Sequence, residues 1–160
     1  MCLVLGALGG VLAASATRPE PVQARFEPAR EPAFDFRLRD QDGRPAALAD
    51  ARGKVVALTF VYTSCRDLCP AEGNDVGDAI ERVGDGVVAY IVSVDPDGDT
   101  PARARDWLER RGLAGRARYL LGSREQLRPI WRHYGIAPIN ATRAEALEAA
   151  AGADAFRAAN

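Results

Sequence analysis

The chain has 160 residues, of which 48% are hydrophobic and 27% charged, with 15 glycines and 10 prolines. This composition excludes a disordered, collagen-like or disulfide-dense protein, and the length suffices for one domain with a buried core. The net charge is −1 at pH 7. Because no excess of positive charge is present to hold a polyanion, nucleic acid is not expected as a partner.

Residues 1–16 form an uncharged segment dominated by Leu, Val, Ala and Gly. It is shorter than the roughly 20 apolar residues that span a bilayer, and Ala14-Ser15-Ala16 resembles a small-x-small cleavage site. We expect this segment to be a secretory signal peptide or part of a membrane anchor. No basic residue precedes it, which leaves open a start upstream of Met1. The predicted location is the periplasm, with a tether to the cytoplasmic membrane if the segment is uncleaved.

Residues 17–32 contain four of the ten prolines and predict a linker. The domain is expected over residues 33–160. At its start, apolar and charged residues alternate over 34–39, which predicts a short strand, and DQDG at 40–43 predicts a hairpin turn. The run KVVALTFVY at 54–62 is typical of a central strand buried on both faces.

Helical and extended patterns then alternate, and the order βαβαβα predicts an open α/β sheet. The expected elements are a helix over 71–83, a strand over 87–94, a helix capped by Asp99 or Thr100 with Pro101 first, a strand over 118–121, a helix capped by Ser123, and a helical tail within 141–160.

Cys65 and Cys69 lie four residues apart where a predicted buried strand gives way to a helix. Open α/β sheets place their sites at such junctions. Unpaired N–H groups and the dipole at a helix N-terminus lower a thiol pKa, and the thiolate is both a nucleophile and a soft-metal ligand. The spacing predicts both sulfurs near one face of the first turn, where they can share an ion or form a disulfide.

Two thiolates with few other donors favour Cu(I), whereas structural zinc would need four ligands that this region does not supply. The competing interpretation is a pair of buried, inert cysteines or a static disulfide. It is disfavoured because a stabilising cross-link normally joins distant segments.

Three ordered stretches resemble signatures of the SCO/SenC family: residues 36–70, which end in YTSCRDLCP, SVDPDGDTPARARDWLERRG at 93–112, and IWRHYGI at 130–136. The resemblance implies a thioredoxin-like fold, a central mixed sheet flanked by helices with an N-terminal β-hairpin extension. It also implies a membrane-tethered protein that helps to assemble the binuclear copper site of cytochrome c oxidase.

The resemblance further implies that Cys65 and Cys69 are the thiolate ligands and redox pair, and that Asp95 is an acidic residue near their loop. From the residues alone, Asp95 is interpreted equally well as a turn-former before Pro96. The family completes its copper site with a histidine in a late segment that this chain lacks. His133 lies elsewhere, in a predicted helix beside aromatic residues, and is expected to be a packing or surface residue.

We expect a C-terminally incomplete domain, because loss of the family's last strand would leave an open sheet edge. The other explanation is a member that lost copper binding and kept its dithiol chemistry.

The predicted function is a copper metallochaperone that delivers Cu(I) through Cys65 and Cys69 to the copper-site subunit of cytochrome c oxidase, or maintains that site's thiols. The alternative is a periplasmic thiol–disulfide reductase acting on another thiol protein, which leaves open whether the chain is an enzyme. A peroxiredoxin-like peroxidase is disfavoured because Arg66 stands where that family has a threonine. A binding module without redox chemistry is the remaining hypothesis.

Overall fold

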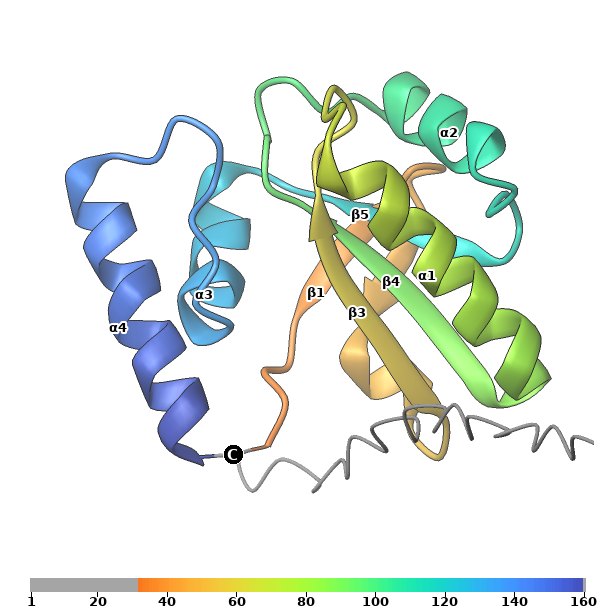
Figure 1. Cartoon of the computed structure of the whole chain (residues 1–160), viewed down its shortest axis with the longest axis horizontal. Helices are drawn as coiled ribbons and strands as arrows, with labels where there is room; N and C mark the ends of the chain where they lie inside the picture. The colour runs from red at the N-terminus through yellow and green to blue at the C-terminus, as the bar shows by residue number, and fades with distance from the viewer. Residues whose placement is uncertain (1–31, 160) are drawn as a thin grey trace, which may run out of the picture.

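The structure is a computed structural model that describes residues 32–159 (Figure 1). Its centre is a five-stranded sheet of order β2-β1-β5-β4-β3. The strands are β1 (Arg37–Asp40), β2 (Pro45–Ala47), β3 (Val55–Val61), β4 (Val87–Ser93) and β5 (Ala117–Leu121).

Strands β3, β4 and β5 are parallel, while the β1–β2 hairpin joins β5 in antiparallel orientation. The predicted mixed sheet with a hairpin extension is confirmed. The expected signal segment and nearly all of the linker lie outside the described residues. Within residues 32–159, no helix is long and apolar enough to cross a bilayer.

The helices begin where the sequence provides caps. Thr100 Oγ1 accepts a hydrogen bond from the Arg103 N–H at 3.3 Å, and Pro101 occupies the first helical position. Ser123 and Gln126 form a reciprocal capping box. The helical segments are α1 (Leu68–Val83), α2 (Pro101–Arg110), α3 (Arg124–His133), α4 (Arg143–Ala159) and the 3₁₀ turns η1 (Leu48–Ala51) and η2 (Gly84–Gly86).

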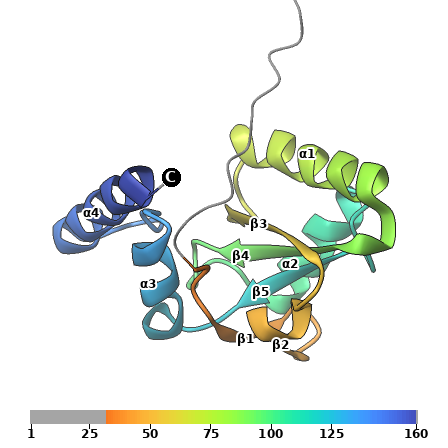
Figure 2. The same ribbon diagram turned by 90° about the horizontal axis from the view of Figure 1, so that it is seen from below.

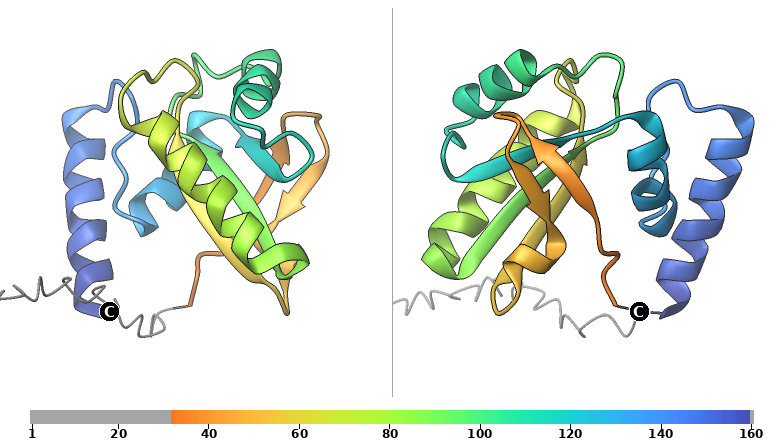
Figure 3. Two further views of the ribbon diagram at one scale, coloured as in Figure 1. Left: turned by 45° about the vertical axis from the view of Figure 1, so that its right-hand side comes forward. Right: turned by 180° about the vertical axis from the view of Figure 1, so that it is seen from behind.

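Helices cover both faces of the sheet (Figure 2). Helices α1 and α2 pack over one face, where Ile91, Trp107 and Tyr119 are almost fully buried. Helix α3 packs on the other face, where Trp131 lies against a second apolar cluster that includes Val92. Helix α4 lies beside α3, outside this layer, as both views of Figure 3 show.

The core strand of the sheet is β4, which pairs with β3 and β5, and the residues from Ala89 to Ser93 are buried. Strand β3 lies at an edge, so the prediction of a central strand buried on both faces is wrong. Among the described residues β3 pairs with β4 alone, and Val55 is 60% exposed. An apolar run indicates that the side chains of a strand face apolar surroundings. It does not indicate whether the strand pairs with one neighbouring strand or with two.

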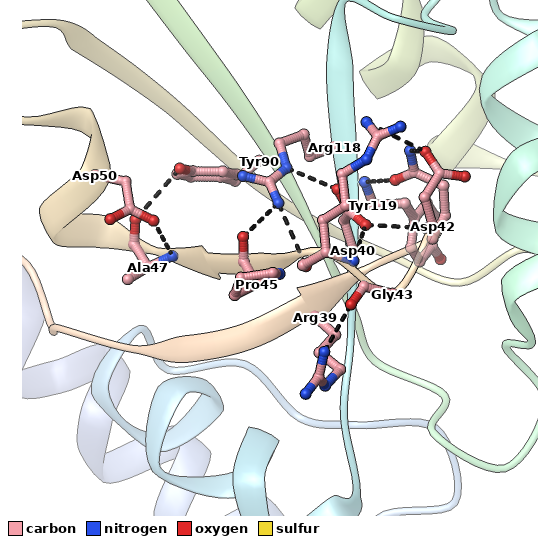
Figure 4. A network of polar contacts seen from close by, with 12 residues as sticks. Arg39, Asp40, Asp42, Gly43, Pro45, Ala47, Asp50, Tyr90, Arg118 and Tyr119 are labelled. Carbon is pink, nitrogen blue, oxygen red and sulfur yellow. Dashed lines mark hydrogen bonds and ion pairs between the residues drawn. The ribbon is translucent and has the colours of Figure 1, made fainter.

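A polar network fastens the β1–β2 hairpin to β5 (Figure 4). Asp40 is 2% exposed, and its Oδ1 accepts hydrogen bonds at 2.9 Å from the backbone N–H groups of Asp42 and Arg44. Its Oδ2 accepts one at 2.9 Å from Arg118 Nε, and Arg118 also donates to the Pro45 carbonyl at 2.7 Å. One carboxylate therefore closes the hairpin turn and joins it to the neighbouring strand.

Replacing this carboxylate should destabilise the fold in a pH-dependent way. Burial raises the pKa of Asp40, but hydrogen bonds from Arg44, Asp42 and Arg118 outweigh it and hold the pKa below its ordinary value of 3.8. The carboxylate thus contributes stability at neutral pH that is lost as the pH falls below about 3.8 toward the folded-state pKa. We expect Asp40→Asn to lower the free energy of unfolding by about 2 kcal/mol at neutral pH in urea titrations.

The difference from the unmodified protein should shrink in the same titrations at pH 3. Asp106→Asn is the control, because Asp106 makes an exposed i,i+4 pair with Arg110 and its loss should change stability by less than about 0.5 kcal/mol. Equal effects of the two substitutions would contradict the role assigned to Asp40.

Candidate functional site

The two cysteines lie where the carboxyl end of β3 leads into α1. Cys69 is in the first turn of the helix and 6% exposed, while Cys65 precedes the N-cap residue Asp67 and is half-buried. Helix α1 starts at Leu68, earlier than the predicted residue 71. Cys69 thus lies inside the first turn and Cys65 in front of it, and their side chains are within hydrogen-bonding distance of one another.

The sulfur of Cys65 is stabilised as a thiolate by the start of the helix. Burial raises the pKa of this thiol, but the Cys69 thiol and the backbone N–H groups of Cys69 and Asp67 donate hydrogen bonds to the sulfur, as does the Tyr62 hydroxyl. Together these donors bring the pKa of Cys65 below its ordinary value of 9.0. The predicted lowering of a thiol pKa by a helix N-terminus is therefore found at Cys65.

Cys69 has the opposite character. Burial and the neighbouring Cys65 sulfur raise the pKa of Cys69 to about 12, although the Tyr62 backbone N–H donates a hydrogen bond to it. The pair therefore comprises a half-buried thiol with a lowered pKa and a buried thiol with a raised pKa that donates a hydrogen bond to it. This division is typical of a dithiol that reacts through its first cysteine.

Tyr62 is a site residue that the sequence analysis did not single out. Its carbonyl accepts a hydrogen bond from the Cys65 N–H at 3.1 Å, and this turn brings the phenol back to the Cys65 sulfur. The hydrogen bond to Cys65 raises the pKa of Tyr62. A hydroxyl-bearing ring three residues before the first cysteine was the signal available in the sequence.

Three aspartates follow β4, and two of them, Asp95 and Asp99, have different partners in the structure. Asp95, the acidic residue expected near the dithiol, accepts a hydrogen bond from the Gly98 N–H at 3.0 Å and so forms the turn after the strand. Asp99 instead contacts the dithiol loop directly: its Oδ1 accepts from the Thr63 N–H at 2.8 Å and from Thr63 Oγ1 at 2.7 Å. Asp99 and Thr100 are both candidate helix caps by sequence, and Thr100 occupies that position.

His133 lies at the end of α3, where its ring packs against Phe34 at 5.4 Å and Tyr134 at 4.8 Å between centroids. Within residues 32–159, no group of three or more His, Cys, Asp or Glu side chains is arranged to hold a metal ion. The described site therefore offers two sulfurs, a donor set that suits Cu(I), which is soft and accepts thiolate ligands.

A family model described as SCO1/SenC matches residues 26–151. The SCO2 homolog of Bos taurus is 32% identical over 144 residues, which cover 84% of this chain and 53% of that protein. The SCO1 homolog 1 of Arabidopsis thaliana is 31% identical over 107 residues, 63% of this chain and 31% of that protein. The chain thus spans about half or less of the length of these relatives.

Solved structures show the same fold. ScoI of Bradyrhizobium japonicum, solved with copper bound, is 29% identical with a TM-score of 0.54, over 62% of this chain and 64% of that one. The apo Sco1 protein of Thermus thermophilus is 31% identical with a TM-score of 0.55, over 64% of this chain and 60% of that one. The predicted thioredoxin-like α/β class is confirmed by these matches together with the flanked mixed sheet.

The two cysteines should differ in reactivity toward iodoacetamide. In the fully reduced protein we expect Cys65 to be alkylated first, with a rate that rises through a pKa below 9.0, while Cys69 is protected by burial and by its pKa of about 12. Peptide mapping by mass spectrometry separates these sites from Cys2. Cys65→Ser should abolish the fast phase, whereas faster alkylation of Cys69 would contradict the assignment.

Removing the Tyr62 hydroxyl should weaken the thiolate. We expect Tyr62→Phe to raise the pKa of Cys65 and to slow its alkylation at neutral pH by several-fold, since one of the hydrogen bonds to the sulfur is lost. The matched control is Tyr90→Phe, which removes a hydroxyl that donates to the Ala47 carbonyl at 3.3 Å in the opposite core cluster. Identical pH profiles for Tyr62→Phe and the unmodified protein would show that the phenol does not stabilise the thiolate.

Proposed function

This chain belongs to the SCO1/SenC family, and we propose that its Cys65–Cys69 dithiol holds Cu(I) as cargo and hands it to a recipient protein. The observation that carries this proposal is the pairing of a stabilised thiolate with a second sulfur at the N-terminus of α1. Structures of ScoI from Bradyrhizobium japonicum and from Arabidopsis thaliana hold copper, which supports the same cargo here.

Copper loading at this site is a proton-for-metal exchange without a redox step. Cu(I) bonds to the sulfurs of Cys65 and Cys69, and any proton that either thiol still holds is released to solvent. Because the pKa of Cys69 is about 12, its proton competes with copper throughout the neutral range. The hydrogen bond from Cys69 to Cys65 shows that the two sulfurs already lie together before the metal arrives.

The surroundings of the dithiol suit transfer to another protein. Leu68, between the two cysteines, is 74% exposed, and Arg66 and Asp67 beside it are exposed as well. An apolar side chain bordered by charged ones offers a contact for a recipient surface. Thiolates of the recipient can then displace Cys65, the accessible ligand, before Cys69.

The recipient that we propose is the subunit of cytochrome c oxidase that carries the binuclear copper site, the client that the family resemblance implies. The proposed location is the periplasmic side of the cytoplasmic membrane, where the uncharged segment at residues 1–16 would direct or tether the chain.

Copper binding should require both sulfurs. We expect the reduced protein, titrated anaerobically with Cu(I) against a competing chelator, to bind one equivalent of copper. Cys65→Ser and Cys69→Ser should each weaken copper binding by more than about a hundredfold. Replacing a residue that only hydrogen-bonds a metal ligand already lowers metal affinity by up to about a hundredfold, and here a ligand itself is lost. Below a pH of about 12, affinity should rise about tenfold per pH unit while only the Cys69 proton is displaced.

His133→Ala is the control in the same titration, since this ring packs against Phe34 and Tyr134 and should not change the affinity. Weak copper binding by a folded, fully reduced protein would overturn the proposed function. If its Cys65–Cys69 disulfide cycled readily with a protein disulfide in that case, thiol–disulfide reduction would replace copper delivery as the explanation.

A further inference from the structure

Asp99 is a buried carboxylate with an unusually complete set of donors. It is 7% exposed and lies between β4 and the first residue of α2. Besides the two hydrogen bonds from Thr63, its Oδ2 accepts one from Ser93 Oγ at 2.6 Å and one from the Tyr119 hydroxyl at 2.8 Å. Four donors from three chain segments therefore converge on two oxygen atoms.

Two of these donors, the Tyr119 hydroxyl and the Thr63 N–H, keep their protons at every pH at which the protein is folded. Burial, followed by the nearness of Asp99, raises the pKa of Tyr119 far above its ordinary value, so its hydroxyl keeps its proton. The Thr63 N–H is a backbone donor at the end of β3. An aspartate accepts from all four donors at once, whereas the amide nitrogen of an asparagine cannot accept and would require the hydroxyls that face it to reorient.

The partners of Asp99 connect the rigid sheet to the dithiol loop. Ser93 ends β4 and Tyr119 lies within β5, and both are fully buried. Thr63 begins the segment that carries Cys65 two residues later. The hydrogen bonds thus fix the entry of the loop relative to the sheet.

We propose that Asp99 is a positioning residue for the dithiol: it holds the Thr63–Cys65 segment so that the Cys65 sulfur meets the N–H groups of Asp67 and Cys69. The proposal rests on the proposed function in taking Cys65 and Cys69 as the working pair. Asp99 acts through Thr63, and its own carboxylate contacts the loop rather than the cargo.

The sign of the effect separates positioning from charge. A negative charge near the dithiol repels a thiolate, so removal of charge alone would make Cys65 more reactive at neutral pH. Loss of positioning has the opposite result, because the hydrogen bonds that stabilise the thiolate lengthen or break. It also lowers the reduction potential of the Cys65–Cys69 disulfide, since a less stabilised thiolate disfavours the reduced form.

The test compares Asp99→Asn with the matched variant Asp97→Asn in the full chain. Asp97 lies in the same turn, but its side chain is 83% exposed and its ion-pair partner, Arg124, is 3.8 Å away. Alkylation of Cys65 is followed against pH, and the disulfide is equilibrated with glutathione buffers, with circular dichroism confirming that each protein is folded. We expect Asp99→Asn to slow alkylation at neutral pH by about tenfold, as a rise of one pKa unit would, and to shift the disulfide toward the oxidised form, with Asp97→Asn unchanged.

Folded Asp99→Asn protein with unchanged or faster alkylation would overturn the proposal, as would equal slowing in Asp97→Asn. Two milder variants cover a failure of Asp99→Asn to fold: Thr63→Val keeps the shape of the loop residue, and Tyr119→Phe keeps the buried ring. Both should slow alkylation, and normal reactivity in both would also overturn the proposal. Copper titration of the unmodified protein is a separate measurement, so its failure would refute the proposed function without deciding the role of Asp99.

Discussion

A single buried carboxylate joins the three parallel strands at the end of the sheet that carries the cysteines. Asp99 accepts hydrogen bonds from Thr63 after β3, from Ser93 in β4 and from Tyr119 in β5. Burying a carboxylate is costly unless donors replace its water, so the burial of Asp99 is tolerable only while all three segments keep their places. The position of the loop that holds Cys65 is therefore coupled to the core of the sheet.

Most of the architecture could be predicted from local patterns. Thr100 and Ser123 cap their helices as expected, and the DQDG turn forms with a positive φ at Gly43. Such features succeed because each depends on residues that are near one another in the sequence. The placement of β3 failed for the opposite reason: its apolar residues are shared between α1 and the second core cluster, and sequence periodicity contains no information on strand order.

The site was predictable to the same degree. The spacing of Cys65 and Cys69 at a strand-to-helix junction identified the dithiol, but not the difference between its sulfurs, which depends on the exact start of α1. The roles of Asp95 and Asp99, which both follow β4, could not be distinguished either. Which of them reaches Thr63 is decided by the turn that Asp95 closes with Gly98, and that turn directs Asp99 toward the strand ends.

The contacts of Asp99 matter for the dithiol loop because β3, the strand that leads into this loop, lies at the edge of the sheet. Within the described residues, β3 receives backbone hydrogen bonds from β4 alone, so its carboxyl end is supported from one side. The Val94 N–H donates to the Val61 carbonyl at 2.9 Å at the end of that pairing, and beyond it the lateral hydrogen bonds to the loop are those of Thr63 with Asp99. The start of α1 supplies the donors that stabilise the Cys65 thiolate. The sheet, through the Asp99 carboxylate, holds the loop in the position in which the Cys65 sulfur meets those donors.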